Sequence, residues 1–88
     1  MRTYETSRAM IAEARSVLAG GVASTLRASM KPTPLYVKSA SGVTVTDVDG
    51  NEYIDYLLAY GPLILGHAHP VFNEKVAEAM SKGITYGL

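Results

Sequence analysis

Two turn signals divide residues 35–56 into three short extended segments, and this pattern constrains the fold more than any other feature of the chain. Ser41-Gly42 separates the first two segments, and Asp49-Gly50 separates the second from the third. Within residues 43–46, valine and threonine alternate, as side chains do along a strand with one apolar face. We therefore expect a three-stranded antiparallel meander, one face of which the first helix or a partner must cover.

An amphipathic helix is expected on each side of this sheet, which makes the fold class α+β. In residues 3–19 the apolar side chains recur at helical spacing, and Gly20-Gly21 supplies a stop. The second helix is expected over residues 70–82, because proline is favourable at the first helical position and Gly83 ends the pattern. Glu78 and Lys82 stand four residues apart and should pair on its surface.

Irregular segments connect these elements. Residues 20–34 predict a loop that ends in two prolines, and a loop of this length is usually functional or disordered. Residues 56–70 predict a second irregular connection, in which glycine and proline bracket the apolar triplet 63–65. The tail, residues 84–88, is apolar, and this favours the interpretation that the chain is the first part of a longer one.

The composition excludes several classes of protein. Hydrophobic residues make up 48% and charged residues 18%, which excludes a disordered chain, and a compact chain of this length would bury roughly 63% of its extended surface. Eight basic residues balance eight acidic ones, so no basic field is expected to hold nucleic acid or a membrane. Cysteine is absent, which excludes disulfides and a thiol nucleophile. Without an export signal or a long apolar run, a cytoplasmic location is expected.

Two motifs look like metal sites, and each has an ordinary structural interpretation. Residues 47–51 (Asp-Val-Asp-Gly-Asn) resemble a calcium loop, but Leu58 stands at the twelfth position, where a carboxylate is required. We interpret them as a turn in which Asp and Asn bond their own backbone. His67 and His69 could share a metal only with a third ligand. The alternative is that His69 caps the second helix and His67 is buried and hydrogen-bonded, so no metal site is predicted.

No catalytic set is found. The loop that begins at Gly20-Gly21 lacks the Gly-Lys-Ser/Thr ending of a phosphate-binding loop. Two side chains nevertheless are candidates for ligand binding. Arg27 is the only charged residue in residues 20–30. Its planar guanidinium can bind a carboxylate or phosphate. The alternative is that it is a solvated surface arginine. Tyr60 precedes Gly61-Pro62 and forms either a pocket wall or ordinary core packing.

Three segments, in this order and spacing, resemble the class III aminotransferases, which use pyridoxal phosphate. They are residues 20–27 (Gly-Gly-Val-Ala-Ser-Thr-Leu-Arg), 47–56 (Asp-Val-Asp-Gly-Asn-Glu-Tyr-Ile-Asp-Tyr) and 61–70 (Gly-Pro-Leu-Ile-Leu-Gly-His-Ala-His-Pro). The closing residues 83–87 also fit. Within the class the chain is most similar to the glutamate-1-semialdehyde 2,1-aminomutases and their close aminotransferase relatives.

The resemblance implies a fold type I enzyme, a homodimer with shared active sites. Residues 1–88 would be the N-terminal segment of the small domain, leading into a large domain that this chain lacks. The Schiff-base lysine, the aspartate that pairs with the pyridine nitrogen and the ring-stacking aromatic lie downstream in the family. The resemblance therefore assigns no catalytic residue to this chain and leaves its contacts to pyridoxal 5'-phosphate unknown.

The resemblance does imply that three residues of this chain contact the substrate. Arg27 matches the arginine that receives the substrate carboxylate, and Ser24 matches the serine of the same loop. Tyr60 stands where the aminomutases usually have tryptophan, and Thr25 where proline is common. These departures leave aminomutase and aminotransferase both open.

The expected function is accordingly that of an N-terminal fragment of an enzyme that moves an amino group on a carboxylate-bearing substrate, an amino acid or amino aldehyde. Such a fragment would be inactive alone. The alternative is a non-catalytic α+β interaction module, or a truncated remnant, that binds a protein partner. Its binding surface would be the apolar side chains of residues 63–65 and 84–88.

Overall fold

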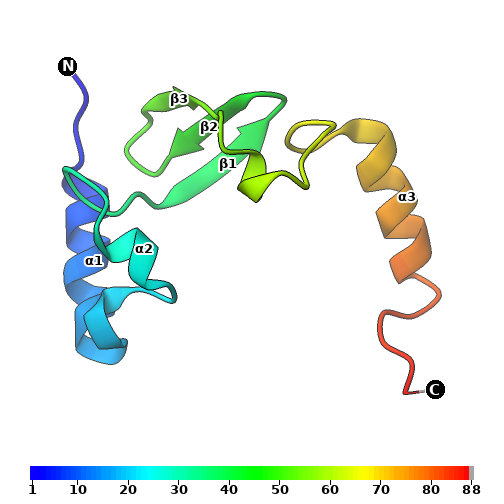
Figure 1. The fold of residues 1–88 in the computed structure, drawn as a ribbon, viewed down its shortest axis with the longest axis horizontal. Helices are drawn as coiled ribbons and strands as arrows, with labels where there is room; N and C mark the ends of the chain where they lie inside the picture. Colours follow the sequence, from blue (N-terminus) through cyan, green and yellow to red (C-terminus); the bar gives the residue numbers. More distant parts are fainter. Residues whose placement is uncertain (88) are drawn as a thin grey trace.

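The structure is a computed structural model that describes residues 1–87, and it is an open α+β arrangement (Figure 1). Leu88, the last residue of the apolar tail, lies outside the described residues. In chain order the elements are α1 (Glu5–Val17), the short 3-10 turn η1 (Ala19–Gly21), α2 (Thr25–Ala28), β1 (Val37–Ser41), β2 (Thr44–Asp47), β3 (Glu52–Ile54), the 3-10 turn η2 (Leu58–Tyr60) and α3 (Pro70–Met80).

The antiparallel meander is confirmed, with strand order β1-β2-β3. Its first turn lies one residue later than the sequence predicts. Ser41 pairs with Thr44, so the loop is Gly42-Val43 rather than Ser41-Gly42. Gly42 has φ +56°, a left-handed conformation that glycine adopts without steric cost and that suits a two-residue hairpin loop.

The second turn is organised by the carboxylate of Asp47, which is 1% exposed. It accepts hydrogen bonds from the backbone N–H groups of Asp49 (3.0 Å) and Asn51 (2.8 Å). It also accepts from the Asn51 side-chain amide and the Tyr53 hydroxyl, each at 2.9 Å. Burial alone raises the pKa of Asp47, but these hydrogen bonds outweigh it, and the pKa is lowered. The turn interpretation of residues 47–51 is thus confirmed.

The same turn caps helix α1 from more than 40 residues away. The Asp49 carboxylate accepts hydrogen bonds from the backbone N–H of Thr6 (2.6 Å) and from the N–H and hydroxyl of Ser7 (2.9 and 2.6 Å). These N–H groups lie in the first turn of α1, where helices leave donors without internal partners. The Asn51 amide donates to the Thr3 carbonyl (2.7 Å). The N-terminus of α1 is therefore fixed to the β2–β3 turn.

Helix α1 does not cover the sheet, contrary to one expectation from the sequence. It reaches the meander through its first turn and otherwise packs on η1, beside the sheet rather than across it (Figure 1). Side chains of the strands and of the segment after them, such as Val37, Ile54 and Tyr56, stay exposed. Among residues 1–87, Ile11 is the only large apolar side chain that is buried.

The shape of the chain leaves much more surface exposed than a compact domain would. Its radius of gyration is 16.0 Å, against about 12 Å for a compact domain of this length. Its accessible surface is 6993 Å², against roughly 5,000 Å² for a compact monomer, so it buries about half of its extended surface rather than 63%. Helix α3 stands away from the other elements (Figure 1).

Both long helices are shorter than predicted, and the first loop has structure of its own. Helix α1 ends at Val17 because Leu18 is extended (φ −126°), and α3 ends at Met80 rather than residue 82. The Gly83 N–H donates to the Met80 carbonyl at 3.1 Å, which closes that end. Residues 20–34, predicted as a loop throughout, contain helix α2 and most of η1.

Candidate functional site

Helix α2 is a single turn that places Ser24 and Arg27 together. Ser24 is extended (φ −145°, ψ 131°) and precedes the helix, and its carbonyl accepts the Arg27 N–H at 3.0 Å. The Ser24 side chain is half-buried, whereas Arg27 is exposed. In the described residues Arg27 makes no ion pair, so its guanidinium is available to an external carboxylate.

Tyr60 lies on a different and conformationally unusual turn. Leu58, Ala59 and Tyr60 all have positive φ (52°, 52° and 66°), and Gly61 follows at 115°. The left-handed region costs about 1–2 kcal/mol for each non-glycine residue, so three in succession need external support. The turn presents the Tyr60 side chain outward, where it is 74% exposed.

The support for this turn comes from Asp55 and His67. One carboxylate oxygen of Asp55 accepts the N–H groups of Leu57 (2.8 Å) and Leu58 (3.1 Å). The other lies 2.6 Å from Nε2 of the half-buried His67. The hydrogen bond with His67, followed by those from the two amides, lowers the pKa of Asp55. The sequence indicated a hydrogen-bonded His67, but it did not reveal Asp55 as its partner.

His67 is itself anchored to the sheet. Its backbone N–H and carbonyl pair with the carbonyl and N–H of Gly42, at 2.8 and 2.9 Å. The neighbouring Gly66 has φ +77°, and a Cβ there would lie 2.8 Å from the Gly42 carbonyl oxygen. The close approach therefore requires glycine at this position. It connects the Tyr60 turn, through Asp55 and His67, to the β1–β2 hairpin.

The second histidine has a separate role. His69 precedes α3, and its Nδ1 accepts the N–H of Phe72 at 3.4 Å, which confirms the predicted helix cap. The two histidines thus serve different structural purposes. Across residues 1–87, no group of three or more His, Cys, Asp or Glu side chains could hold a metal ion.

The three predicted substrate contacts fall into two separate groups. Arg27 lies on α2 and Ser24 directly precedes it, where α2 contacts η1, whereas Tyr60 lies on η2, between the sheet and α3 (Figure 1). No contact between α2 and η2 is formed within the described residues. Whether the three act on one substrate stays a prediction that depends on groups outside this chain.

Comparison with known proteins identifies the class to which this fold and these segments belong. The sequence model of the family aminotransferase class III matches residues 25–87. The chain therefore belongs to the class III aminotransferase family.

Individual relatives refine this assignment. The chain is 52% identical over 87 residues to glutamate-1-semialdehyde 2,1-aminomutase of Methanococcoides burtonii, a match that covers 99% of the chain and 20% of that protein. A solved structure of a transaminase with pyridoxal phosphate bound superposes with a TM-score of 0.87 at 43% identity, covering 100% of the chain and 20% of the other. A glutamate-1-semialdehyde aminomutase from Pseudomonas aeruginosa gives 0.84 at 30% identity, covering 96% and 19%.

These matches confirm the family resemblance and the fold class. The chain spans about one fifth of the length of the relatives it matches, and that fifth is their N-terminal part. The comparisons favour the enzyme segment over the free-standing interaction module.

Proposed function

We propose that residues 1–88 form the N-terminal segment of the small domain of a pyridoxal-phosphate-dependent aminotransferase or aminomutase, leading into the large domain. The enzyme moves an amino group on a carboxylate-bearing substrate, an amino acid or amino aldehyde. The similarity to aminomutases and transaminases supports this proposal. We also propose a cytoplasmic homodimer. No helix within residues 1–87 is long and apolar enough to cross a membrane.

The exposed apolar surface supports the presence of further protein around this segment. Four large apolar side chains at or just before the start of α3 are between 55% and 85% exposed: Ile64, Leu65, Val71 and Phe72. A stable monomer seldom leaves so many of them in contact with water. In the proposed enzyme, the large domain and the second subunit cover this surface.

No lysine of the described residues lies in the environment that a Schiff base with the cofactor needs. A Schiff-base lysine needs a desolvated pocket that lowers its pKa. The four lysines of this chain are all exposed, and Lys75 and Lys82 lie beside Glu78 on the surface of α3. We therefore propose that the Schiff-base lysine lies elsewhere in the full-length enzyme and that this segment contributes to substrate binding.

The single observation that carries the substrate assignment is the placement of Arg27. Its guanidinium is exposed on a one-turn helix beside Ser24, and no carboxylate of the described residues neutralises it. A bidentate guanidinium fixes the orientation of a carboxylate while another part of the molecule reacts. Arg27 is therefore proposed to bind the substrate carboxylate.

The test compares substrates with and without a carboxylate in the full-length enzyme. We expect Arg27→Ala to lower kcat/KM for amino-acid substrates roughly 10- to 100-fold, mainly through KM, because a charged hydrogen bond contributes about 1.5–3 kcal/mol. Simple amines should change by less than about threefold. Lys38→Ala, which removes an exposed cation on β1, is the matched control. Equal losses on both substrate types would contradict the assignment.

A further inference from the structure

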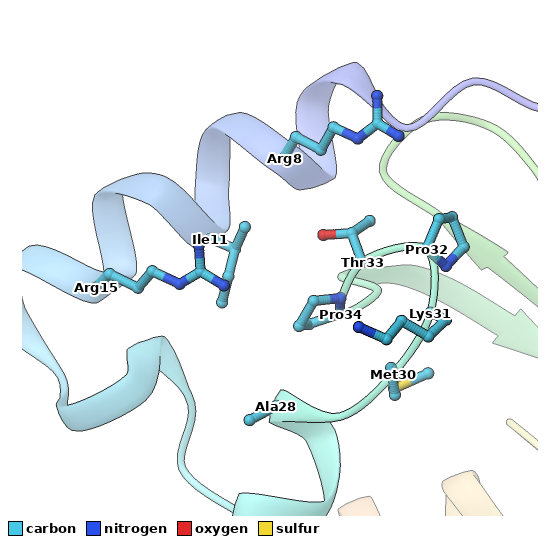
Figure 2. A pocket seen from close by; sticks show the side chains of 9 residues that line it. All are labelled: Arg8, Ile11, Arg15, Ala28, Met30, Lys31, Pro32, Thr33 and Pro34. Atoms are coloured by element: carbon cyan, nitrogen blue, oxygen red, sulfur yellow. The ribbon is translucent and has the colours of Figure 1, made fainter.

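A cavity of about 280 Å³ lies between α1 and the segment that follows α2. Its walls are Arg8, Ile11, Arg15, Ala28, Met30, Lys31, Pro32, Thr33 and Pro34 (Figure 2). Arg27 does not line it, although the neighbouring Ala28 does. The cavity is therefore separate from the proposed substrate contact on the same short helix.

The charge around this cavity is entirely positive. Arg8, Arg15 and Lys31 contribute three cations, and no acidic side chain lines the cavity. Within residues 1–87 none of the three forms an ion pair. Figure 2 shows the Lys31 side chain extending across the cavity and the Arg15 guanidinium turned towards it, while the Arg8 guanidinium lies at the rim. Three like charges around one hollow repel one another unless an anion lies among them.

A hydroxyl points into the same space. Thr33 is 6% exposed as a residue, and its side-chain oxygen is directed into the cavity (Figure 2). No buried polar side-chain atom of the described residues lacks a hydrogen-bond partner, so this oxygen is accessible from the cavity. Thr33 thus offers a hydrogen-bond donor to an anion that enters beside the three cations.

We propose that this cavity binds a small multivalent oxyanion, whose phosphate or carboxylate oxygens accept from Thr33, Lys31 and Arg15. A volume of 280 Å³ corresponds to roughly nine water molecules at their share of liquid volume, so it holds an anion together with a few carbon atoms. The accessible lining of the cavity is mostly polar, which suits the anionic part. This site is independent of the proposed function, since it uses neither Arg27 nor Tyr60.

The proposal is tested by titration calorimetry on the full-length protein at low ionic strength. Inorganic pyrophosphate tests whether the cavity binds phosphate groups, and citrate tests whether it binds carboxylate groups. We expect at least one of them to bind with a dissociation constant below about 1 mM, with an affinity that falls as salt is added. Selective binding of one identifies the functional group. If neither binds below about 10 mM, the proposal is wrong.

Variants locate the binding. Lys31→Met removes an exposed cation without disturbing the fold and should weaken the affinity about tenfold or more, whereas Lys38→Met, on the outer strand, should leave it unchanged. Thr33→Val keeps the shape and removes only the hydroxyl, and it should weaken binding about threefold to tenfold. Equal affinities for the Lys31 and Lys38 variants would overturn the site. Arg27→Ala should retain anion binding, so this proposal and the proposed function fail separately.

Discussion

The first 54 residues and the last 33 described residues hold their conformations in different ways. In the first region, the carboxylates of Asp47 and Asp49 gather hydrogen bonds from the β2–β3 turn and from the start of α1. The bonds of Asp49 to α1 join parts of the chain that are more than 40 residues apart. In residues 55–87 most hydrogen bonds are local. The exceptions are the backbone bonds to the first hairpin, from Asp55 to Val43 and between His67 and Gly42, and the side-chain bond between Asp55 and His67.

Helix α3 illustrates the second region. Its side-chain ion pairs are Lys75–Glu78 at 3.3 Å and Lys82–Glu78 at 3.6 Å, and all three side chains are more than half exposed. Its large apolar side chains are exposed, and no other helix or strand of the described residues packs against it. The difference teaches that the first region is specified by its own polar contacts, whereas we expect the second to be stabilised by the rest of the proposed enzyme.

The largest effect is expected from Asp47→Ala. Removing this buried carboxylate leaves four donors of the turn without their acceptor, which should destabilise the meander by roughly 3 kcal/mol or more. Amide exchange at Asp49 and Asn51 in the full-length protein should accelerate by about two orders of magnitude. Glu52→Ala, an exposed neighbour, is the control. Unchanged protection would show that this turn is not the anchor of the first region.

A smaller effect is expected at Asp49, which caps α1. In Asp49→Ala, exchange at the Thr6 and Ser7 amides should accelerate about 3- to 30-fold, while the second half of α1 stays protected. Glu5→Ala removes a first-turn acid that makes none of these hydrogen bonds, and it serves as the matched control.

Acid should reproduce the Asp49 effect in the unmodified protein. Burial by itself would raise the pKa of Asp49, but the hydrogen bonds from Ser7 and Thr6 lower it to about 2 from an ordinary 3.8. A depressed pKa means that the cap stabilises the folded state fully above pH 3.8 and is lost as the pH falls towards 2. Protection at Thr6 and Ser7 that does not change over this interval would contradict the cap.

The smallest effect is expected in the second region, from Glu78→Gln. This change removes both ion pairs of α3, yet exposed pairs contribute little, so stability should fall by at most about 0.5 kcal/mol. Urea unfolding of the full-length protein, with Glu74→Gln as control, measures the difference. A loss above about 1 kcal/mol would mean that α3 depends on its own surface charges, and the contrast between the two regions would not hold.

Much of the local structure could be predicted from the sequence, because its causes lie within a few residues. The apolar spacing predicted both long helices, the turn at Asp49-Gly50 followed from side chains that bond their own backbone, and His69 was recognised as a cap. The helix ends and the first hairpin turn were displaced by one to two residues, since fraying and pairing register depend on neighbours in space.

The site was only partly predictable. Ser24, Arg27 and Tyr60 were selected by resemblance, and their joint role awaits the substrate test. The contact of Asp55 with His67 was missed because these two residues, 12 positions apart, meet only after the chain turns through a left-handed segment. One signal was present, since an aspartate two residues before an irregular turn commonly bonds the backbone that follows it.

The sequence by itself determined the family, the order of helices and strands, and the turns whose hydrogen bonds are local. Only the tertiary structure decided that Asp49 caps a helix 42 residues away, that α1 leaves the sheet uncovered, and that three cations surround the Thr33 hydroxyl. The physical reason is the distance along the chain over which each interaction acts. Side-chain periodicity and turn chemistry act between near neighbours, whereas long-range capping and shared cavities depend on where the whole chain places groups that the sequence keeps apart.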